Sequence, residues 1–572
     1  MAMGEISVPL NQALRQTITR RAPLLGSAAL LMALMPATAL AAPLACAQLT
    51  KASLPGMRIV SAIETRDTLP AADLVRLRGE KAQLVNPFLR NLPPFCRVIA
   101  TLTPVPGSRI GIELWLPATW NGKLLGIGNH GFGGEFERGD MAMGMHRGYA
   151  VVTTNMGHGG GVYSSKNSAT QAGFNVGIAS FAVGNPVAVE DFAWRATHEM
   201  TVAAKALVRH HYGKRARRSY FDACSNGGRQ SMREAQQFPN DYDGIISGSA
   251  AMNWTRSMAS SLYYYRLGSL SAGARMTMPK LRLAQNAAIA ACDSLDGLAD
   301  GLIADPARCN WNPKVLLCRP GADESSCLSA DELAAIEGAE APFKDPRTGE
   351  LLYEGQAPGS ETYWRNMLSG NAVTTNHFRF LVTQNPAWEP SANMDPVALL
   401  RLSEQPGAPG LGINSVDPDL SAFRARGGKL IQYHGWNDPS FAAGFAIRYY
   451  AEVVDLEPDQ NKMASTQSYY RLFMVPGMAH CYGGEGPVHF GALDHETSPV
   501  IDADHDVLEA LDRWVDKGIA PEKLIATQFD KDQRPQRQMP ICPWPKVAIY
   551  SGGDPNRTES FSCRKPTADR GL

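Results

Sequence analysis

Ser225 lies in a segment whose small residues are typical of a nucleophile elbow. The segment Tyr220–Gly228 has the sequence YFDACSNGG, so the serine follows a strand-like run and precedes a helix-like one. Ala223 occupies the place of the first glycine of the G-x-S-x-G pattern, where small residues are needed because the strained turn packs closely. A serine at such a turn becomes a nucleophile when a neighbouring base takes its proton. The alternative is an ordinary serine that caps a helix.

An acid and a base follow Ser225 in the order that is typical of such hydrolases, which is serine, acid, histidine. Asp438 comes after the apolar run Lys429–Tyr433, and His480 comes after the apolar run Tyr470–Val475. We expect both side chains at the carboxyl ends of strands, where the active-site residues of open α/β sheets gather. The pattern therefore predicts a catalytic triad in which His480 is the general base and Asp438 orients it.

Two other residues could take these roles. His434 could replace His480 as the base, but it shares the loop of the acid and is expected to make a structural hydrogen bond. Asp455 could replace Asp438, but it lies inside a helical stretch. Both are weaker candidates than the residues that directly follow strands.

Two glycine-rich segments could supply the backbone N–H groups that stabilise an oxyanion. His130–Gly134 (HGFGG) follows the predicted strand Lys123–Gly128, whereas His158–Gly161 (HGGG) follows the next strand. The oxyanion loop of such hydrolases follows the strand before the one that leads to the nucleophile. This order selects the first segment, and it predicts the N–H groups of Gly131 and Asn226 as the oxyanion hole.

The runs around these residues alternate between strand and helix patterns. Further strand-like runs are Gly148–Asn155, Ser219–Ala223 and Asp243–Ser247, and helical runs are Val187–Tyr212 and Gly227–Phe238. This alternation predicts an α/β fold with a mostly parallel sheet that is covered on both faces. The stretch from Met252 to Pro418 breaks the alternation and contains four of the ten cysteines. We interpret it as an inserted, lid-like domain.

Composition narrows the classes of function. The chain has 572 residues, of which 44% are hydrophobic and 19% charged, as expected for a large globular protein. Lys plus Arg and Asp plus Glu both number 55, so the formal net charge is zero. A nucleic-acid partner is therefore not predicted, because such binding needs a basic excess or stripe.

The N-terminus resembles a secretory signal in its three parts. Arginines before residue 22 precede the apolar run Leu24–Leu40, which ends in the small-x-small sequence at residues 39–41. This pattern predicts a signal peptide over residues 1–41, a mature protein that begins near Ala42, and a secreted or periplasmic location without a membrane anchor. A membrane span is disfavoured by Pro36 and by the shortness of the run. A twin-arginine signal is an alternative, because Arg20 and Arg21 are adjacent.

Ten cysteines in an exported chain favour disulfides over thiol or metal chemistry. None lies in a CxxC pair, which argues against a zinc site of the cysteine type. Bridges between sequential neighbours would close short loops. Cys224 and Cys481 have no such neighbour and would have to pair across the chain.

The motifs Cys224-Ser225 and His480-Cys481 resemble the paired Cys-Ser and His-Cys motifs of the tannase/feruloyl esterase family. The resemblance extends over nearly the whole mature chain. It implies an α/β-hydrolase core at residues 42–251 and 419–572, and a lid at residues 252–418 between the serine and the acid. It also implies the five disulfides Cys224–Cys481, Cys46–Cys96, Cys292–Cys309, Cys318–Cys327 and Cys542–Cys563.

A calcium site in the lid is a further expectation. The segment Cys292–Leu302 (CDSLDGLADGL) brings three carboxylates into eight residues, and hard oxygen ligands at this density suit Ca²⁺. The spacing is not that of an EF-hand, and an acidic helix-capping turn is the alternative. The segment resembles the structural lid calcium site of the family. Carried over by position, the ligands are the side chains of Asp293, Asp296 and Asp300 and the carbonyl groups of Leu298 and Leu302.

The resemblance implies a small aromatic ester as the substrate. Family members cleave feruloyl esters, galloyl esters, chlorogenate or mono(2-hydroxyethyl) terephthalate. Phe441 matches an aromatic position that packs on the acyl ring in the terephthalate-type enzyme, although a core aromatic is an equal alternative. The carboxylate-binding arginine of that enzyme has no convincing counterpart between Trp364 and Trp388, where Arg379 is the nearest basic residue. We therefore predict a feruloyl esterase first, with tannase or terephthalate monoester hydrolase as alternatives.

Two other classes of function are weighed against an esterase. A polyphenol-binding protein on an inactive hydrolase scaffold would be expected to lack Ser225, Asp438 or His480, and all three are present. A thiol oxidoreductase that used Cys224 would need a free thiol of low pKa. The oligomeric state is left open by the sequence.

Overall fold

The computed structural model describes residues 43–52, 54–69, 89–159, 179–269, 271–408, 411–492 and 500–566. All of them belong to one compact unit. The predicted signal peptide, residues 1–41, lies outside the described residues. Of the helices that are described, none is long and apolar enough to cross a membrane.

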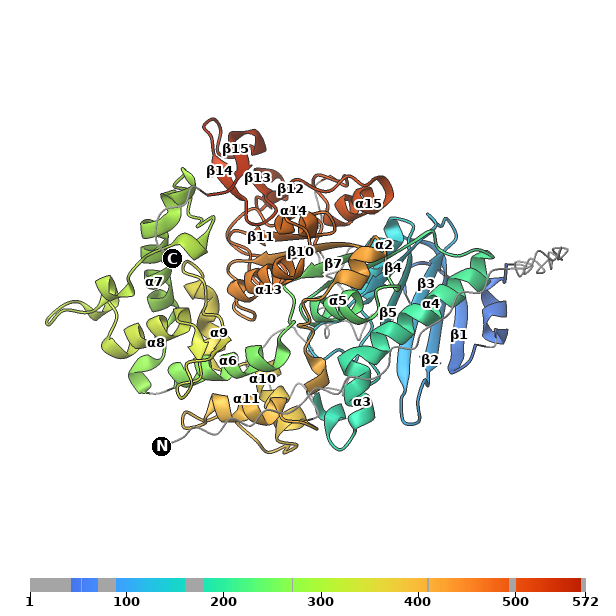
Figure 1. Cartoon of the computed structure of the whole chain (residues 1–572), viewed down its shortest axis with the longest axis horizontal. Helices are drawn as coiled ribbons and strands as arrows, with labels where there is room; N and C mark the ends of the chain where they lie inside the picture. Colours follow the sequence, from blue (N-terminus) through green and yellow to red (C-terminus); the bar gives the residue numbers. More distant parts are fainter. Residues whose placement is uncertain are drawn as a thin grey trace, which may run out of the picture. The chain divides into compact units, whose positions relative to one another are not determined.

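A nine-stranded sheet in the described part of the chain carries the predicted active-site loops (Figure 1). Its order is β1-β2-β3-β5-β4-β6-β7-β10-β11. The strands are β1 (Met57–Asp67), β2 (Leu92–Leu102), β3 (Ile110–Pro117), β4 (Lys123–Ile127), β5 (Ala150–Thr154), β6 (Arg218–Cys224), β7 (Gly244–Gly248), β10 (Lys429–Gly435) and β11 (Tyr470–Val475). From β5 to β11 every neighbouring pair is parallel, which confirms the predicted parallel sheet.

The antiparallel strands β1, β2 and β3 are an addition that the strand and helix patterns did not predict. Charged residues inside β2 and β3 obscure their apolar character. Arg97 of β2 donates to the carboxylate of Glu113 on β3 at 2.7 Å, and Arg138 donates to the same carboxylate at 2.9 Å. All three side chains are buried, so the charges are paired within the fold rather than solvated.

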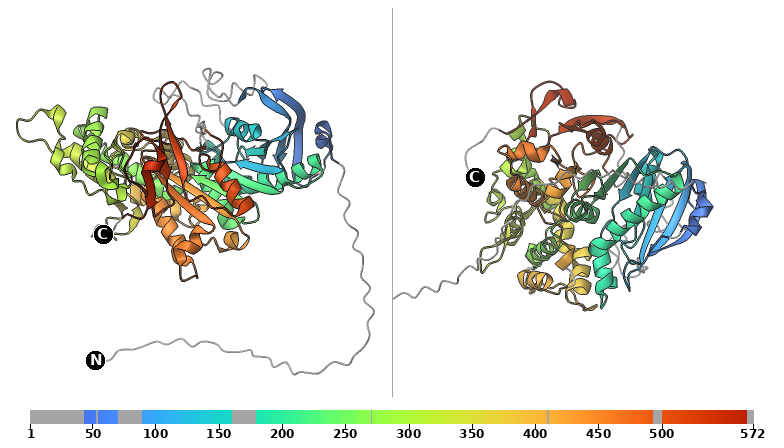
Figure 2. Two further views of the ribbon diagram at one scale, coloured as in Figure 1. Left: turned by 90° about the horizontal axis from the view of Figure 1, so that it is seen from above. Right: turned by 45° about the vertical axis from the view of Figure 1, so that its right-hand side comes forward.

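Helices cover both faces of the sheet and enclose two apolar cores. On one face lie α4 (Ala196–Tyr212), α5 (Asn226–Gln237) and α13 (Ala443–Leu456), and α4 runs across the blue strands in Figure 1 and in the right-hand view of Figure 2. On the other face lie α2 (Arg138–His146) and α15 (Val507–Lys517). This arrangement agrees with the doubly covered sheet that the alternation predicts.

The predicted helix over Val187–Tyr212 is divided in the structure. It consists of α3 (Pro186–Glu190), the π-helical turn η6 (Asp191–Arg195) and α4. The buried carboxylate of Asp191 lies in the π-helical turn, where it accepts hydrogen bonds from Ser108 Oγ at 2.7 Å and from Arg195 Nη1 at 2.6 Å. This local change of helical pitch has no signal in the hydrophobic period.

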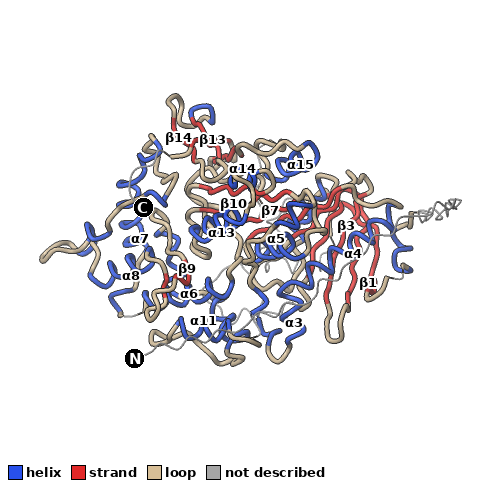
Figure 3. The backbone as a smooth tube through the Cα atoms, in the orientation of Figure 1, coloured by secondary structure: helices blue, strands red, loops and turns tan. Residues whose placement is uncertain are grey.

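Residues 252–418 lie between β7 and β10, and their described part adds no strand to the nine-stranded sheet. Figure 3 shows this segment as mostly helix and loop. Its elements are α6 (Trp254–Leu267), α7 (Met278–Cys292), α8 (Ala330–Glu340), β8 (Phe343–Lys344), β9 (Leu351–Tyr353), α9 (Arg365–Ser369), α10 (Ala372–Asn376) and α11 (Pro396–Glu404). The segment belongs to the same compact unit as the sheet, and its role as a separate lid domain stays a prediction.

The C-terminal part adds two small antiparallel sheets. The remaining elements are α12 (Ser421–Ala425), α14 (Lys462–Gln467), β12 (Leu524–Phe529), β13 (Pro535–Ile541), β14 (Val547–Tyr550) and β15 (Phe561–Arg564). Strands β12 and β13 form one pair, and β14 and β15 form the other.

Five disulfides connect these elements, and their pairing is the one that the family resemblance implies. They are Cys46–Cys96, Cys224–Cys481, Cys292–Cys309, Cys318–Cys327 and Cys542–Cys563. Four of them close loops of 50 residues or fewer, whereas Cys224–Cys481 joins positions that are 257 residues apart. Cys224 therefore offers no free thiol for an oxidoreductase mechanism.

Candidate active site

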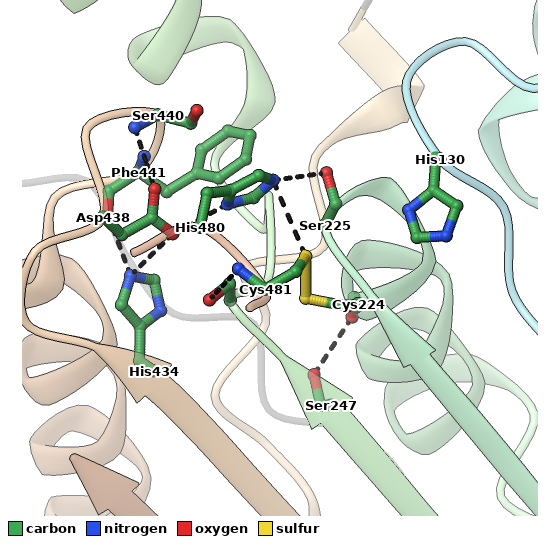
Figure 4. Close-up of a disulfide and its surroundings, with 12 residues drawn as sticks. His130, Cys224, Ser225, Ser247, His434, Asp438, Ser440, Phe441, His480 and Cys481 are labelled. Atoms are coloured by element: carbon green, nitrogen blue, oxygen red, sulfur yellow. Dashed lines mark hydrogen bonds and ion pairs between the residues drawn. A yellow bond between two sulfur atoms is a disulfide. The ribbon is translucent and has the colours of Figure 1, made fainter. Parts of the chain in front are cut away.

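Ser225, His480 and Asp438 form a continuous chain of hydrogen bonds at the carboxyl end of the sheet (Figure 4). His480 Nε2 lies 2.9 Å from Ser225 Oγ, and His480 Nδ1 lies 2.8 Å from Asp438 Oδ2. The three residues follow β6, β11 and β10, respectively. A base within hydrogen-bonding reach of a hydroxyl, and oriented by a buried carboxylate, is the arrangement that activates a serine.

The turn at Ser225 has the strained backbone of a nucleophile elbow. Its φ and ψ angles are 64° and −124°, a conformation that residues with a side chain rarely adopt. Hydrogen bonds hold it in place, because Ser225 N–H donates to Gly248 O and Ala251 N–H donates to Ser225 O, both at 3.0 Å. A Cβ atom added at Gly227 would lie 2.8 Å from the Cβ of Ala223. The turn therefore accepts alanine at position 223 only because the facing residue is glycine.

The loop of the acid holds the Asp438 carboxylate in its ionised form. Burial by itself would raise the pKa of Asp438, but the charge and the hydrogen bond of His480 outweigh it, so the pKa lies below its usual value. The backbone N–H groups of Ser440 and Phe441 also donate to this carboxylate, at 2.8 and 3.1 Å. The ionised acid can therefore stabilise a proton on His480.

The rival base, His434, has a structural role. Its Nε2 atom donates to the carbonyl oxygen of Phe441 at 2.8 Å, and burial lowers its pKa, so the ring is neutral. This hydrogen bond closes the loop that carries Asp438. The outcome matches the expectation for His434, and Asp455 lies on α13, outside the chain of hydrogen bonds at Ser225.

The first glycine-rich segment lies beside the elbow, as its place after β4 predicts. Strands β4 and β6 are neighbours in the sheet, and the chain leaves them for opposite faces, to α2 and to α5. Such a reversal of strand order opens a crevice at the carboxyl ends of the strands. Within the described part of the chain, the N–H groups of Gly131 and Asn226 donate no hydrogen bond. Both groups remain available to an oxyanion, and their role stays a prediction.

The second glycine-rich segment supports the first instead of competing with it. His158 is buried, its ring stacks on Phe181 with centroids 3.9 Å apart, and burial lowers its pKa to about 4. The neutral ring donates from Nε2 to the carbonyl oxygen of Phe132, which follows Gly131, at 2.8 Å. Gly160 and Gly161 lie outside the described residues.

Comparison with known proteins agrees with this geometry. The family model described as "Tannase and feruloyl esterase" matches residues 96–564. The chain belongs to this family. It is 35% identical to an uncharacterized esterase of Xanthomonas campestris pv. campestris over 92% of both chains. It is 31% identical to a probable feruloyl esterase B of Aspergillus clavatus over 80% of this chain and 84% of that one.

A solved structure shows the same fold. The crystal structure of feruloyl esterase B from Aspergillus oryzae superposes with a TM-score of 0.80 at 28% identity, and the match covers 91% of this chain and 99% of that chain. The nine-stranded sheet is therefore an α/β-hydrolase sheet. This member of the tannase and feruloyl esterase family is a carboxylic ester hydrolase.

In this esterase the disulfide Cys224–Cys481 joins the neighbour of the serine to the neighbour of the histidine (Figure 4). The Sγ atom of Cys481 lies 3.7 Å from His480 Nε2. Cys481 N–H also donates to Ser249 Oγ at 3.3 Å, so the loop of the histidine is tied to the residue that follows β7. The bridge thus lies directly beside the hydrogen bond between Ser225 and His480.

A buried polar network holds the elbow and the first glycine-rich segment in place. The sequence patterns did not predict this network. Arg229 Nε donates to the side-chain oxygen of Asn226 at 2.7 Å, and its other nitrogens donate to the carbonyl groups of Phe192 and Ala193. Arg229 is fully buried. These oxygens accept hydrogen bonds from the guanidinium group in place of water, which explains how a charged residue lies on the core side of α5.

Gln230 connects α5 to the start of the first glycine-rich segment. Its side-chain oxygen accepts from the backbone N–H of Asn129 at 2.8 Å, and Asn129 Nδ2 donates to Thr154 O at 2.7 Å. The signal was present in the sequence, because α5 (NGGRQSMREAQQ) contains almost no apolar residues although it is buried. A buried helix with this composition must satisfy its polar groups internally.

Phe441 lies against the base. Its side chain is buried, and the ring centroid is 5.2 Å from that of His480. Figure 4 shows the two rings side by side. The backbone of Phe441 also closes the loop of the acid, so this residue has a structural role independent of any substrate.

The inserted segment contacts the loops of the triad. Asn437 Nδ2 donates to Gly359 O at 3.2 Å, and Gln356 Nε2 donates to Pro439 O at 3.4 Å. Both contacts join residues 252–418 to the loop that carries Asp438. The segment is thus placed where it can border a bound substrate.

The acidic loop of the inserted segment contains the three aspartates that were predicted to bind calcium. Asp296 is buried, and burial together with the charges of Asp300 and Asp293 outweighs the N–H of Leu298 and raises its pKa to about 6. Asp293 accepts from the N–H groups of Asp300 and Gly301 at 3.1 and 2.9 Å. Asp300 forms an ion pair with Arg537. Among the described residues, these three carboxylates do not form a group whose side-chain oxygens all lie within 4.8 Å of one another, so the structure does not assemble the predicted site, and Ca²⁺ there stays a proposal.

Proposed function

We propose that this chain is an exported serine esterase that hydrolyses esters of hydroxycinnamic-type acids, with feruloyl esters as the preferred class. The chain of hydrogen bonds from Ser225 through His480 to Asp438 is the observation that supports the serine mechanism. Relatives named feruloyl esterase B support the substrate class. Five disulfides support export, because such bridges persist in oxidising compartments.

In the first half of the reaction, Ser225 Oγ attacks the ester carbonyl carbon while His480 Nε2 takes the hydroxyl proton. The Nδ1–H group of His480 donates to the ionised Asp438, which stabilises the imidazolium. The N–H groups of Gly131 and Asn226 donate to the oxyanion of the tetrahedral intermediate. The intermediate then collapses, and the alcohol leaves with the proton from His480 Nε2, so that the aromatic acid remains esterified to Ser225.

The second half releases the aromatic acid. Water attacks the acyl carbon while His480 Nε2 takes one of its protons, and a second oxyanion forms in the same place. Collapse of this intermediate returns the proton to Ser225 Oγ and frees the acid. The same base therefore serves both halves, which requires one fixed position for its ring.

The substrate proposal depends on Phe441 and on the inserted segment. A buried aromatic ring next to His480 offers an apolar surface to an aromatic acyl group, and aromatic pairs stabilise such contacts by roughly 0.5–1.5 kcal/mol. Arg379 is engaged elsewhere, because it forms an ion pair with Glu389 and donates to Trp388 O at 3.0 Å. A terephthalate carboxylate therefore has no counterion at Arg379. Galloyl esters remain the second candidate, since the family description includes tannase.

A substrate panel tests this proposal. We expect kcat/KM for methyl ferulate to exceed that for methyl gallate, chlorogenate and mono(2-hydroxyethyl) terephthalate, because relatives named feruloyl esterase B support this class of substrate. The measurement is initial rates on all four esters, with Ser225→Ala as the blank. A preference for methyl gallate would make the chain a tannase, and binding without turnover would make it a polyphenol-binding protein.

We also propose that Ca²⁺ stabilises the inserted segment, held by the side chains of Asp293, Asp296 and Asp300 and by two backbone carbonyl groups. A cation bound to the folded state alone stabilises by mass action, by about 2.7 kcal/mol at a hundredfold excess over Kd. Chelation is therefore expected to lower the melting temperature by about 2–3 °C, with little change in activity per folded molecule.

Differential scanning calorimetry with and without a chelator measures this effect, and elemental analysis reports the calcium content. Asp296→Asn is the control, and its melting temperature should no longer respond to the chelator. An unchanged melt of the native protein together with an absence of calcium would contradict the proposal.

A further inference from the structure

A group of side chains of the types that bind metals lies where α4, α5 and the turn before β7 meet, apart from the acidic loop of the inserted segment. His198 projects from α4, Glu234 from α5, and Asp241 from the turn before β7. One ring nitrogen and one oxygen from each carboxylate all lie within 4.8 Å of one another. His198 Nδ1 is 2.6 Å from Asp241 Oδ2. Three elements that are separate in the sequence thus converge on one point.

Glu234 is the unusual member of this group. Its side chain is 1% exposed, and neither carboxylate oxygen accepts a hydrogen bond from the described residues. A buried carboxylate without a donor is costly, and such groups are rare in native proteins. The neighbouring carboxylate of Asp241 cannot act as a donor while both groups are ionised. A shared proton or a cation must therefore lie between them.

The nearby basic side chains do not fill this role. Lys205 Nζ is 4.0 Å from Asp241 Oδ1, and it donates to the backbone carbonyl groups of Asn240 and Asp241. The guanidinium group of Arg233 donates to Gly412 O at 2.7 Å and also to Asn414 O. Neither forms a hydrogen bond with Glu234. Two positively charged side chains thus lie near the carboxylate pair, but neither donates a hydrogen bond to Glu234.

The imidazole of His198 is held in a fixed orientation toward the two carboxylates. Its ring stacks on Phe238 with centroids 4.1 Å apart and an angle of 17° between the planes. The His198 side chain is 27% exposed, whereas that of Asp241 is 11% exposed. The group is therefore partly exposed to solvent on the side of His198, which offers an entry path for an ion.

We propose that His198, Glu234 and Asp241 bind a divalent transition-metal ion, and that Zn²⁺ matches this donor set best. Zinc binds imidazole nitrogen and carboxylate oxygen at about 2.0–2.2 Å and accepts three protein ligands with water in the fourth position. An imidazole ligand favours zinc over the hard cations calcium and magnesium. The ion replaces the shared proton as the partner of Glu234. It links α4 to α5, the helix that begins directly after Ser225, and so stabilises the support of the elbow.

The test uses the full-length protein after treatment with a chelator, titrated with zinc chloride alone. Calorimetry is expected to show one tight equivalent, and zinc in a hundredfold excess over Kd should raise the melting temperature by about 2–3 °C. Glu234→Gln keeps the shape of the side chain and removes its charge, and it should weaken zinc binding by at least tenfold. His198→Gln should do the same. Two variants serve as controls. They are His210→Gln, which lies on α4 like His198, and Asp296→Asn in the acidic loop of the inserted segment, and both should bind zinc at this site as the native chain does.

A stability measurement without metal separates this proposal from a carboxyl pair that only shares a proton. Metal-free Glu234→Gln is expected to melt at or above the metal-free native protein, because it lacks the buried carboxylate, yet to lose the rise that zinc causes. Zinc binding of equal affinity in Glu234→Gln and in the native protein would overturn the proposal. Absence of any zinc-dependent shift in the native protein would overturn it as well.

Discussion

Ser225→Ala is expected to lower kcat by about 10⁴- to 10⁶-fold while the protein remains folded. The reason is that, in the proposed mechanism, the Ser225 hydroxyl, 2.9 Å from His480 Nε2, forms the acyl-enzyme. The rate is measured on methyl ferulate, and the fold is checked by circular dichroism and melting temperature. Alanine keeps the Cβ atom and removes only the hydroxyl group, so the melting temperature should change little.

Ser231→Ala is the control, because Ser231 lies on α5, the helix that begins directly after Ser225, and donates only to Gly228 O at 2.7 Å. It should cost a little stability and leave the chemistry unchanged. Mass spectrometry of the intact protein during turnover should show an added acyl group on the native chain and none on Ser225→Ala. If Ser225→Ala keeps more than a few per cent of the native activity, Ser225 is not the nucleophile.

The double change Cys224→Ala with Cys481→Ala is expected to reduce both stability and activity. The bridge closes a loop of 257 residues, which corresponds to about 5 kcal/mol of unfolded-state entropy, although engineered bridges often contribute less. It also ties the loop of His480 to the end of β6. A displacement of about 1 Å at the reacting atoms can cost on the order of a hundredfold in rate, so kcat should fall at temperatures where the variant is still folded.

The double change Cys542→Ala with Cys563→Ala distinguishes these two effects. That bridge closes a loop of 21 residues, for which the same entropy model gives about 3 kcal/mol, and it lies between β13 and β15, away from the triad. Its loss should lower the melting temperature and leave kcat of the folded protein near the native value. Peptide mapping without reduction checks the pairing directly. An equal effect of both double changes on kcat would show that the bridge beside Ser225 has no role in positioning the triad.

Local patterns were sufficient to predict the triad. Ser225, Asp438 and His480 each follow an apolar run that forms a parallel strand, and parallel strands bring their carboxyl ends to one edge of a sheet. Distance along the chain is therefore no obstacle to predicting that these side chains meet. The choice of the oxyanion loop rests on the same argument, because the order of the strands decides which loop lies beside the elbow.

The tertiary structure decided everything that depends on contacts without a periodic pattern. Such contacts join segments whose local sequence resembles an ordinary loop or helix. Examples are the hydrogen bond of His158, those of Arg229 and Gln230, and the proximity of Glu234 to Asp241. The sequence by itself was enough to predict the parallel strands and the order of the candidate catalytic residues. The family resemblance added the cysteine pairs. Hydrophobic periodicity specifies which face of an element is buried, but it does not specify which buried polar group will find which partner. That pairing is set by the packing of α4 and α5 on the sheet, which only the folded chain provides.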